Sequence, residues 1–384
     1  MHNAGMSEDA ARDPLAEAAF AQRLHAATPR VFVTPALLAL NVVVFAAMAA
    51  MGVGVLGGRP DDYIRFGANF GPLTSGGEWW RLVTCTFIHA GILHLLFNMW
   101  ALWDSGQLTE RLFGNAWFFA IYLYAGICGS VASMLWRNEA VSVGASGAVF
   151  GVFGALLAYT LRQRGSIPPS MMNRLRISTS IFVTYSLFYG FAASGIDNAA
   201  HLGGLAAGLV AGLLAARPLA APERARGHGM RIVAGALIVA VTVPAALVFT
   251  PDTSRVYRQA LALQKAIDAF SAEERRLSGR FDAAAKRARE GRDDRAALQE
   301  LRADLIPAWD KAVSQLAALE LDATAPMRRD YDILLRYAQA RREMTAGLAD
   351  FLDAGTPASR QRFLDTRAAT EAALQEYRER QSKK

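Results

Sequence analysis

The sequence predicts an all-α membrane protein: a polytopic bundle of membrane-spanning helices, followed by a soluble α-helical bundle or coiled coil. Two observations lead to this class. Hydrophobic residues make up 53% of the 384 residues, yet 20% are charged, which is more charge than a bare membrane bundle would hold. The charge is also uneven, because every lysine lies after residue 264 whereas residues 31–250 are poor in Asp and Glu. Two segments of different composition therefore lie end to end.

The same composition excludes several other classes of protein. The apolar content is too high for a disordered chain. Cys85 and Cys128 are the two cysteines, and both lie inside apolar runs, so we expect no disulfide scaffold. The net charge of +7 is mostly arginine in loops between apolar segments, so no nucleic-acid partner is expected. The sequence also predicts neither a cofactor nor a bound metal.

Seven segments are interpreted as membrane spans, because a helix needs about 20 mostly apolar residues to cross the bilayer. They are residues 31–56, 82–103, 116–136, 146–161, 177–194, 201–216 and 232–249. The chain is therefore expected to have four parts. These are an N-terminal tail (1–30), a six-span core (31–217), a basic loop with the seventh span (218–250) and a soluble helical domain (251–384).

Arginine placement predicts how these spans are oriented, because cytoplasmic loops carry an excess of Lys and Arg. Arginines gather in the N-terminal tail and in the loops after the second, fourth and sixth spans. We therefore expect a cytoplasmic N-terminus and an extracytoplasmic C-terminal domain. Without the seventh span, that domain would lie in the cytoplasm. The richness in arginine and alanine points to a bacterial source, and so to the bacterial inner membrane.

Three histidines, His89, His94 and His201, lie within or at the ends of spans. A single histidine there is more often a hydrogen-bonded structural residue, although ionisable groups in spans are costly and often functional. In the run HLLFN, His94 and Asn98 are four residues apart and share a helix face. Two hydrogen-bond donors aimed at one point suit a transient anion. The alternative is a polar seam against a neighbouring helix.

The run GASGAVFGVFG places Ser146 where the fourth span begins. A serine there is either a helix cap or a nucleophile beside the free N–H groups at the positive end of a helix. Gly147, Gly151 and Gly154 leave one side of this span smooth. Another helix could therefore approach it closely.

The sixth span is the expected partner, in the run AHLGGLAAG. Gly204 and Gly208 form a small-residue face, and His201 lies one turn before Gly204 on the same side. If the two spans pack through their glycines, Ser146 and His201 lie at similar depth, and the imidazole could take the proton of the serine. Asp197, one turn earlier, is either an orienting carboxylate or, as we favour, a helix cap.

With these motifs in place, the sequence resembles the rhomboid family of intramembrane serine proteases. The matching runs are GANFGPLTSGGEWWRLVTCTFIHAGILHLLFNMW (67–100), GASGAVFG (144–151) and NAAHLGGLAAG (198–208). They occur in the family's order, and the resemblance covers about residues 31–217. It implies a catalytic dyad of Ser146 as nucleophile and His201 as general base, with no acidic third member. It also implies an oxyanion hole formed by the backbone N–H of Ser146 with the side chains of His94 and Asn98.

The resemblance implies structural roles for five further residues. Trp80 and Arg81 match a Trp-Arg pair in a membrane-embedded first loop beside the active site. Glu110 matches a structural glutamate after the second span. Gly204 and Gly208 match glycines at a helix contact.

Two features concern the surroundings of the base and the access of substrate. Phe150 stands where the family often has a tyrosine stacked on the base, so the ring can still pack on His201 while a hydroxyl contact is lost. Residues 189–197, with Gly190 and Gly195, match the position of a lateral gate.

Such a protease would cleave transmembrane segments of other membrane proteins in the lipid bilayer, through an acyl-enzyme. Segments with small or helix-breaking residues near the outer surface would be preferred. The alternative is a catalytically silent rhomboid-like protein that binds or chaperones membrane clients. We would expect a silent relative to lack Ser146 or His201, and both are present. A transporter has little support, since the polar residues cluster near one side.

Residues 251–384 predict about four amphipathic helices, packed as a bundle or coiled coil. Apolar residues recur there at steps of three and four along 298–319 and 327–338. Pro307 should kink one helix. Breaks are expected near Gly291, 323–326 and 355–357. A structural domain, or one that binds a protein partner, is the expected function, and recruitment of substrate is an option.

Overall fold

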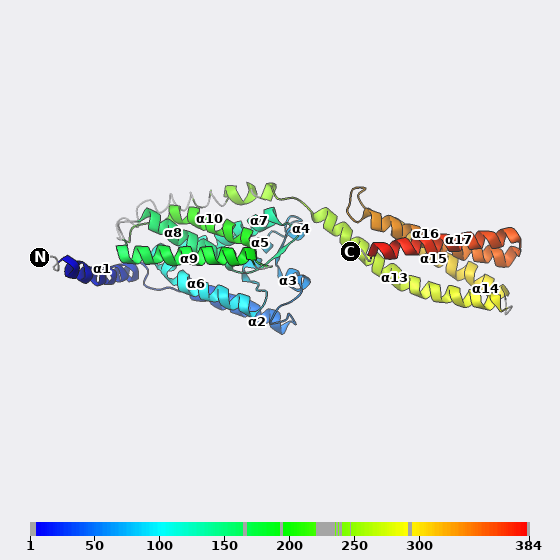
Figure 1. The fold of residues 1–384 in the computed structure, drawn as a ribbon, viewed down its shortest axis with the longest axis horizontal. Coiled ribbons are helices and arrows are strands. Elements are labelled where there is room, and N and C mark those ends of the chain that lie inside the picture. Colours follow the sequence, from blue (N-terminus) through cyan, green and yellow to red (C-terminus); the bar gives the residue numbers. More distant parts are fainter. Residues whose placement is uncertain are drawn as a thin grey trace. The chain divides into compact units, whose positions relative to one another are not determined.

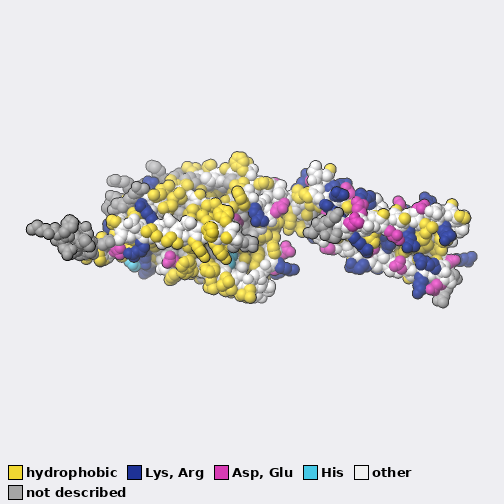
Figure 2. All heavy atoms as spheres, in the orientation of Figure 1, with side chains coloured by type: hydrophobic (Ala, Val, Ile, Leu, Met, Phe, Trp, Pro, Cys, Tyr) yellow, Lys and Arg dark blue, Asp and Glu magenta, His cyan; other side chains and the backbone are white. Residues whose placement is uncertain are grey.

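The computed structural model describes residues 5–163, 167–192, 195–219, 251–290 and 294–381, with residues 235, 237, 240–245 and 247–250; side chains are described from residue 14 onward. The chain divides into two compact units, Met1–Ser254 and Arg255–Lys384. Figure 1 shows helices in both units. Apolar side chains gather over the first unit and charged ones over the second (Figure 2). The predicted all-α class is confirmed.

The first unit is built from the helices that the apolar segments predicted, preceded by a helix in the N-terminal tail. They are α1 (Gly5–Ala27), α2 (Val33–Ala50), α6 (Ile92–Phe113), α7 (Asn115–Trp136), α8 (Ser146–Arg162), α9 (Pro169–Ala192) and α10 (Asn198–Ala215). Within the described ranges, α2, α7 and α10 are by themselves long and apolar enough to cross a membrane. α8 is apolar but shorter. The count of six spans therefore stays a prediction.

The second predicted span, 82–103, is wrong as a single helix. It is broken between the short helices α5 (Arg81–Thr84) and η1 (Cys85–Phe87) on one side and α6 on the other, with a bend of 94°. Ile88 is extended, and Gly91 has a φ of +104°, a backbone conformation that residues other than glycine rarely adopt. The chain therefore turns here before α6 begins. Among the described residues, a fourth candidate span exists only if the two parts of the bent pair are taken together.

The loop between α2 and α6, called the first loop below, is built from short elements. They are α3 (Pro60–Phe66), β1 (Asn69–Phe70), α4 (Gly71–Thr74), α5 and η1. β1 pairs in antiparallel register with β2 (Val141–Ser142), and Asn69 lies opposite Ser142. Because β2 lies just before α8, this pairing joins the first loop to the start of α8.

α8 and α10 approach each other through glycines. A Cβ added to Gly204 would lie 1.9 Å from the carbonyl oxygen of Gly147, and one added to Gly208 would lie 2.0 Å from that of Gly151. Both distances are far inside van der Waals contact, so only glycine fits at these two positions of α10. The two helices thus approach each other at glycines that the sequence singled out, and this contact fixes their register.

Glu110 lies in the last turns of α6 rather than after the second span, because α6 runs on to Phe113. Its side chain is fully buried. The carboxylate accepts the N–H groups of Phe32 at 2.9 Å, Val33 at 2.8 Å and Thr34 at 2.7 Å, and also the Thr34 hydroxyl at 2.7 Å. An anion here satisfies the free N–H groups at the positive end of α2. Glu110 therefore joins α6 to α2.

Only part of the predicted seventh span, 232–249, lies within the described residues. A Cβ added to Gly235 would lie 3.4 Å from the ring of Trp117, near the start of α7. Further along both segments, the hydroxyl oxygens of Thr242 and Tyr124 are 3.1 Å apart. The described part of this segment therefore runs beside α7 and parallel to it, and the span itself stays a prediction.

The second unit is a helical bundle. Its elements are α13 (Ser254–Arg289), α14 (Asp294–Glu300), η2 (Leu301–Leu305), α15 (Ile306–Ala317), α16 (Arg328–Ala354) and α17 (Pro357–Gln381). Leu301, Leu305 and Trp309 are buried in its core, as their periodic spacing predicted. Before Pro307 the helix widens into the π-helical turn η2. Such a turn accommodates a proline that cannot donate to the preceding turn.

Candidate active site

Ser146 is the first residue of α8, and its side chain is half-buried. The residue at the cap position is Ala145, and no side chain caps the helix, so the Ser146 hydroxyl is not used as a cap. Gly144 leads into the helix with a φ of +117°. Ser146 is therefore not the helix cap that the alternative interpretation required. Its hydroxyl lies beside the free N–H groups of the first turn.

His201 is buried in the first turn of α10 and faces α8. The ring of Phe150 stacks on the His201 imidazole, with centroids 4.3 Å apart and planes 7° apart. Ser146 and Phe150 lie one turn apart on the same face of α8, so His201 lies on the face that carries Ser146. Within the described residues, Ser146 and His201 share no hydrogen bond. Catalytic hydrogen bonds are often long in sites without substrate.

Asp197 caps α10, which confirms the interpretation that we favoured. Its Oδ1 accepts the N–H of Ala200 at 2.9 Å, and its Oδ2 accepts the hydroxyl of Ser142 at 2.7 Å. The Nδ1 atom of His201 is buried and has no hydrogen-bond partner in the described part of the chain. Stacking and burial, rather than a carboxylate, therefore orient the imidazole.

His94 lies in the first turn of α6 and faces the loop that leads to Ser146. A Cβ added to Gly144 would lie 2.7 Å from Nε2 of His94, so this glycine makes room for the ring. Nδ1 of His94 accepts the N–H of Ala90 at 3.3 Å. In a neutral imidazole the proton is then on Nε2, which can donate toward the loop.

Asn98 is buried one turn beyond His94. Its Nδ2 donates one hydrogen bond to the carbonyl oxygen of His94, at 2.9 Å, within the same helix. The amide has a second N–H, which this bond does not use. His94 and Asn98 therefore follow each other along the face of α6 that approaches Gly144.

His89 belongs to the same cluster, although the sequence suggested no role for it. It is buried between η1 and α6, and its Nε2 accepts the N–H of Ala145 at 3.4 Å. Its ring meets that of His94 edge-on, with centroids 5.2 Å apart. His89 therefore supports the residue just before Ser146. Its presence in the same run as His94 was the only sign of this in the sequence.

Arg81 is buried and holds the first loop together. Its guanidinium donates to the carbonyl oxygens of Ile64 at 2.7 Å and Ala68 at 3.0 Å, and it pairs with Glu78 at 2.7 Å. The same group lies 4.6 Å from the ring centroid of Trp80, which is 50% exposed. An exposed tryptophan held by a buried arginine fits a loop at the membrane–water interface.

The segment expected to act as a lateral gate, 189–197, is described except for two residues. Gly190 is buried, and a Cβ there would lie 2.2 Å from Oδ1 of Asn198 on α10. Earlier on α9, the ring of Phe182 stacks on Phe153 of α8, with centroids 4.1 Å apart. α9 thus packs on α8 through aromatic rings, and its gating role stays a prediction.

Not all of the site residues lie together. One cluster joins the start of α8, the start of α10 and the start of α6 through the contacts above; it contains Ser146, Phe150, His201, His94, Asn98 and His89. Gly204 and Gly208 lie behind it in the contact of α10 with α8. Glu110 lies about three turns further along α6 and is separate from this cluster.

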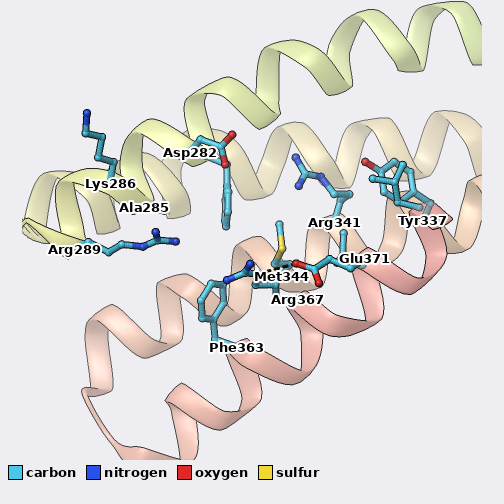
Figure 3. A pocket seen from close by; sticks show the side chains of 13 residues that line it. Asp282, Ala285, Lys286, Arg289, Tyr337, Arg341, Met344, Phe363, Arg367 and Glu371 are labelled. Atoms are coloured by element: carbon cyan, nitrogen blue, oxygen red, sulfur yellow. Dashed lines mark hydrogen bonds and ion pairs between the residues drawn. The ribbon is translucent and has the colours of Figure 1, made fainter. Parts of the chain in front are cut away.

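A hollow of about 490 Å³ lies in the second unit, between α13, α16 and α17. Figure 3 shows Met344, Phe363 and Arg367 among the side chains that line it, with Arg367 paired to Glu371. No histidine follows residue 228 in the sequence and no cysteine follows residue 128. The hollow therefore lacks a histidine base and a thiol nucleophile, and nothing in its lining resembles the cluster around Ser146.

Comparison with known proteins bears on this cluster. A family model described as the Rhomboid domain matches residues 76–218. The chain is 37% identical to "Rhomboid protease GluP" of Bacillus subtilis (strain 168) over 206 residues, which are 54% of this chain and 38% of that protein. It is 35% identical to "Putative rhomboid protease YdcA" of the same organism over 149 residues, 38% of this chain and 72% of that protein.

A relative from another bacterium matches a similar share. The chain is 31% identical to "Rhomboid protease AarA" of Providencia stuartii over 192 residues, which are 44% of this chain and 68% of that protein. The matched part thus covers more than two thirds of YdcA and of AarA, but well under half of GluP.

Proposed function

This chain belongs to the rhomboid family, and from that premise we propose that it is an intramembrane serine endopeptidase. Its substrates would be transmembrane segments of other membrane proteins. One observation carries the proposal. The imidazole of His201 lies stacked on Phe150, on the face of α8 where Ser146 presents a hydroxyl that caps no helix.

The reaction would be acyl transfer to Ser146. The Ser146 oxygen attacks the carbonyl carbon of a peptide bond while His201 takes the hydroxyl proton. The C–N bond then breaks, and His201 returns the proton to the leaving amine. A water molecule, deprotonated by His201, hydrolyses the ester and restores the serine. The positive end of α8 favours the negative charge that develops beside Ser146.

Three donors are suited to the tetrahedral oxyanion. They are the backbone N–H of Ser146, the Nε2–H of His94 and the unused N–H of Asn98. His94 is the best supported, because the bond from Ala90 to its Nδ1 leaves the proton on the nitrogen that faces Gly144. Donors held in place before the reaction stabilise the transition state without reorganisation.

The expected substrates follow from the backbone chemistry of helices. An intact transmembrane helix hides its peptide bonds in its own hydrogen bonds, so cleavage needs local unwinding. Segments with small or helix-breaking residues near the outer surface would unwind most easily. α9, with the loop 189–197, is the proposed lateral entry.

We place the protein in the bacterial inner membrane, with the N-terminus in the cytoplasm and the C-terminal unit outside it. Arginine placement supports this orientation. The described part of the seventh span supports it as well, because it runs parallel to α7. α7 ends next to β2 and the start of α8, on the side of the bundle where Ser146 lies.

A fluorophosphonate probe tests the proposed nucleophile. Attack by the Ser146 oxygen on phosphorus would expel fluoride and leave a covalent label on the full-length protein in detergent. We expect labelling of the wild type and none of Ser146→Ala. Ser178→Ala is the matched control, since this exposed serine only donates to Leu175 of its own helix. Equal labelling of wild type and Ser146→Ala would favour a silent, client-binding protein and contradict the proposal.

A further inference from the structure

The chain just before α13 is fastened to the side of the molecule that carries the first loop. The Nδ2 atom of Asn138 donates to the carbonyl oxygen of Pro251 at 2.7 Å and to the hydroxyl of Thr253 at 3.0 Å. The hydroxyl of Ser75 lies 3.4 Å from a carboxylate oxygen of Asp252. Three consecutive residues thus bond either to the first loop or to the turn between α7 and β2.

Asn138 also holds the first loop through its backbone. Its carbonyl oxygen accepts the N–H of Gly71, the first residue of α4, at 3.0 Å. The two residues are so close that a Cβ on Gly71 would lie 1.5 Å from Oδ1 of Asn138. On the far side of α4, a Cβ on Gly76 would lie 3.1 Å from the Cβ of the buried Ser254. The linker and the first loop therefore pack without space for a further side chain.

These contacts flank the strand pair that leads to the proposed nucleophile. Asn138 lies three residues before β2, and Gly71 directly follows β1. β1 and β2 pair with each other, and the chain from β2 passes through Gly144 into Ser146. Movement of Asn138 would therefore act on both strands of the pair and on the short segment before Ser146.

The contact is not needed to begin α13. A carboxylate oxygen of Asp252 accepts the N–H of Ser254, the first residue of α13, at 2.9 Å, so this N–H of the helix start is satisfied from within the linker. The bonds of Asn138 to Pro251 and Thr253 therefore have a different consequence. They connect the linker to the first loop and to β2.

We propose that residues 251–254 form a latch on the rim of the active site, and that Asn138 is the positioning residue that connects this latch to the first loop and to β2. Because α13 begins at Ser254, a displacement of α13 would be transmitted to the latch along the chain. The latch would make the arrangement before Ser146 depend on the C-terminal unit. This inference rests on the proposed function in one respect only, which is that its activity measurement needs an active protease.

Two full-length variants open the latch from opposite sides. Asn138→Ala removes both side-chain hydrogen bonds, and Thr253→Val removes one acceptor with little change of shape. We expect kcat for a transmembrane substrate to fall by about tenfold in the first and about threefold in the second, with KM nearly unchanged. Thr253→Ser keeps the hydroxyl and should restore kcat. Thr356→Val is the matched control, because its hydroxyl accepts the N–H of Ser359 in the first turn of α17, and kcat should stay at the wild-type value.

Hydrogen exchange followed by mass spectrometry separates the latch from a general loss of stability. In Asn138→Ala and Thr253→Val, exchange should rise in residues 69–76 and 138–144 and stay at the wild-type rate in α10. A rise throughout the first unit would show a merely structural role for Asn138 and overturn the proposal. Unchanged exchange in both segments would overturn it too.

Failure of the latch and failure of the proposed function give different results. If the wild type is not labelled by the fluorophosphonate, the protease proposal fails, while exchange in 69–76 still decides whether the latch exists. If the wild type is labelled and both variants keep wild-type kcat, the latch is overturned and the protease proposal stands.

Discussion

The phenyl ring of Phe150 lies flat on the imidazole of His201, with ring centroids 4.3 Å apart and planes 7° apart. Both side chains are buried, and Nδ1 of His201 has no hydrogen-bond partner among the described residues. Asp197, the acidic residue nearest in the sequence, is occupied as the cap of α10. An aromatic surface therefore orients the imidazole, and we propose that in catalysis it takes the place of the carboxylate of a catalytic triad.

Removal of this ring should lower the turnover of the folded protein, in addition to the stability that is lost with a buried aromatic side chain. In Phe150→Ala the imidazole can rotate away from the face that carries Ser146, so we expect kcat to fall by about ten- to a hundredfold with a small change in KM. Phe150→Tyr keeps the ring and should stay within about threefold of the wild type. Steady-state cleavage of a transmembrane substrate in detergent measures both. The matched control is Phe119→Ala, an exposed phenylalanine of α7, and wild-type kcat in Phe150→Ala would contradict the orienting role.

Replacement of the buried Glu110 should lower the stability of the fold, whether or not the protein is catalytically active. Glu110→Gln places an N–H₂ group where N–H donors of the first turn of α2 converge, so at least one buried donor loses its acceptor. We expect the free energy of unfolding to fall by about 2–4 kcal/mol. Reversible unfolding in detergent measures it. Glu139→Gln is the exposed control, and equal stability of the two variants would show that the carboxylate is dispensable.

A side chain at Gly204 should force α10 and α8 apart. In Gly204→Ala the new methyl group would lie 1.9 Å from the Gly147 carbonyl oxygen, so the helices must separate. We expect a loss of about 2–4 kcal/mol in unfolding free energy and loss of cleavage, because His201 moves with α10. Gly279→Ala is the control, since its methyl group meets nothing within 4 Å beyond the adjoining backbone of α13 and should stabilise α13 by up to about 1 kcal/mol. A tolerated Gly204→Ala would mean that the contact is loose.

The sequence predicted those features that depend on residues close together in the chain. The GASG run predicted a helix that begins at Ser146, and α8 begins there. Small residues at a spacing of four predicted the contact of Gly204 with Gly147. Turn-forming residues predicted the breaks between the helices of the second unit, one of them at Gly355. Each of these is a local pattern with one structural solution.

The sequence could not predict features that depend on distant parts of the chain. The bend before α6 was hidden, because hydropathy records how apolar a segment is and not its direction. The pairing of Asn69 with Ser142 involves strands too short for an alternating pattern. Asn138 is one polar residue in a turn, and only the fold brings Pro251 and Gly71 to it. His89 was visible as a histidine, but its bond to the N–H of Ala145 was not.

The side of the membrane on which the C-terminal unit lies can be tested with reporters fused after Lys384. The bonds of Asn138 to Pro251 and Thr253 place the linker beside the first loop, on the side of the bundle where Ser146 lies. We therefore expect an alkaline phosphatase fusion to be active and a green fluorescent protein fusion to be dark in a bacterial host, because the first needs export and the second folds in the cytoplasm. The same reporters fused before Met1 should give the opposite pattern. A fluorescent C-terminal fusion without phosphatase activity would mean that residues 232–249 do not cross the membrane, and the contacts of Asn138 could not then form.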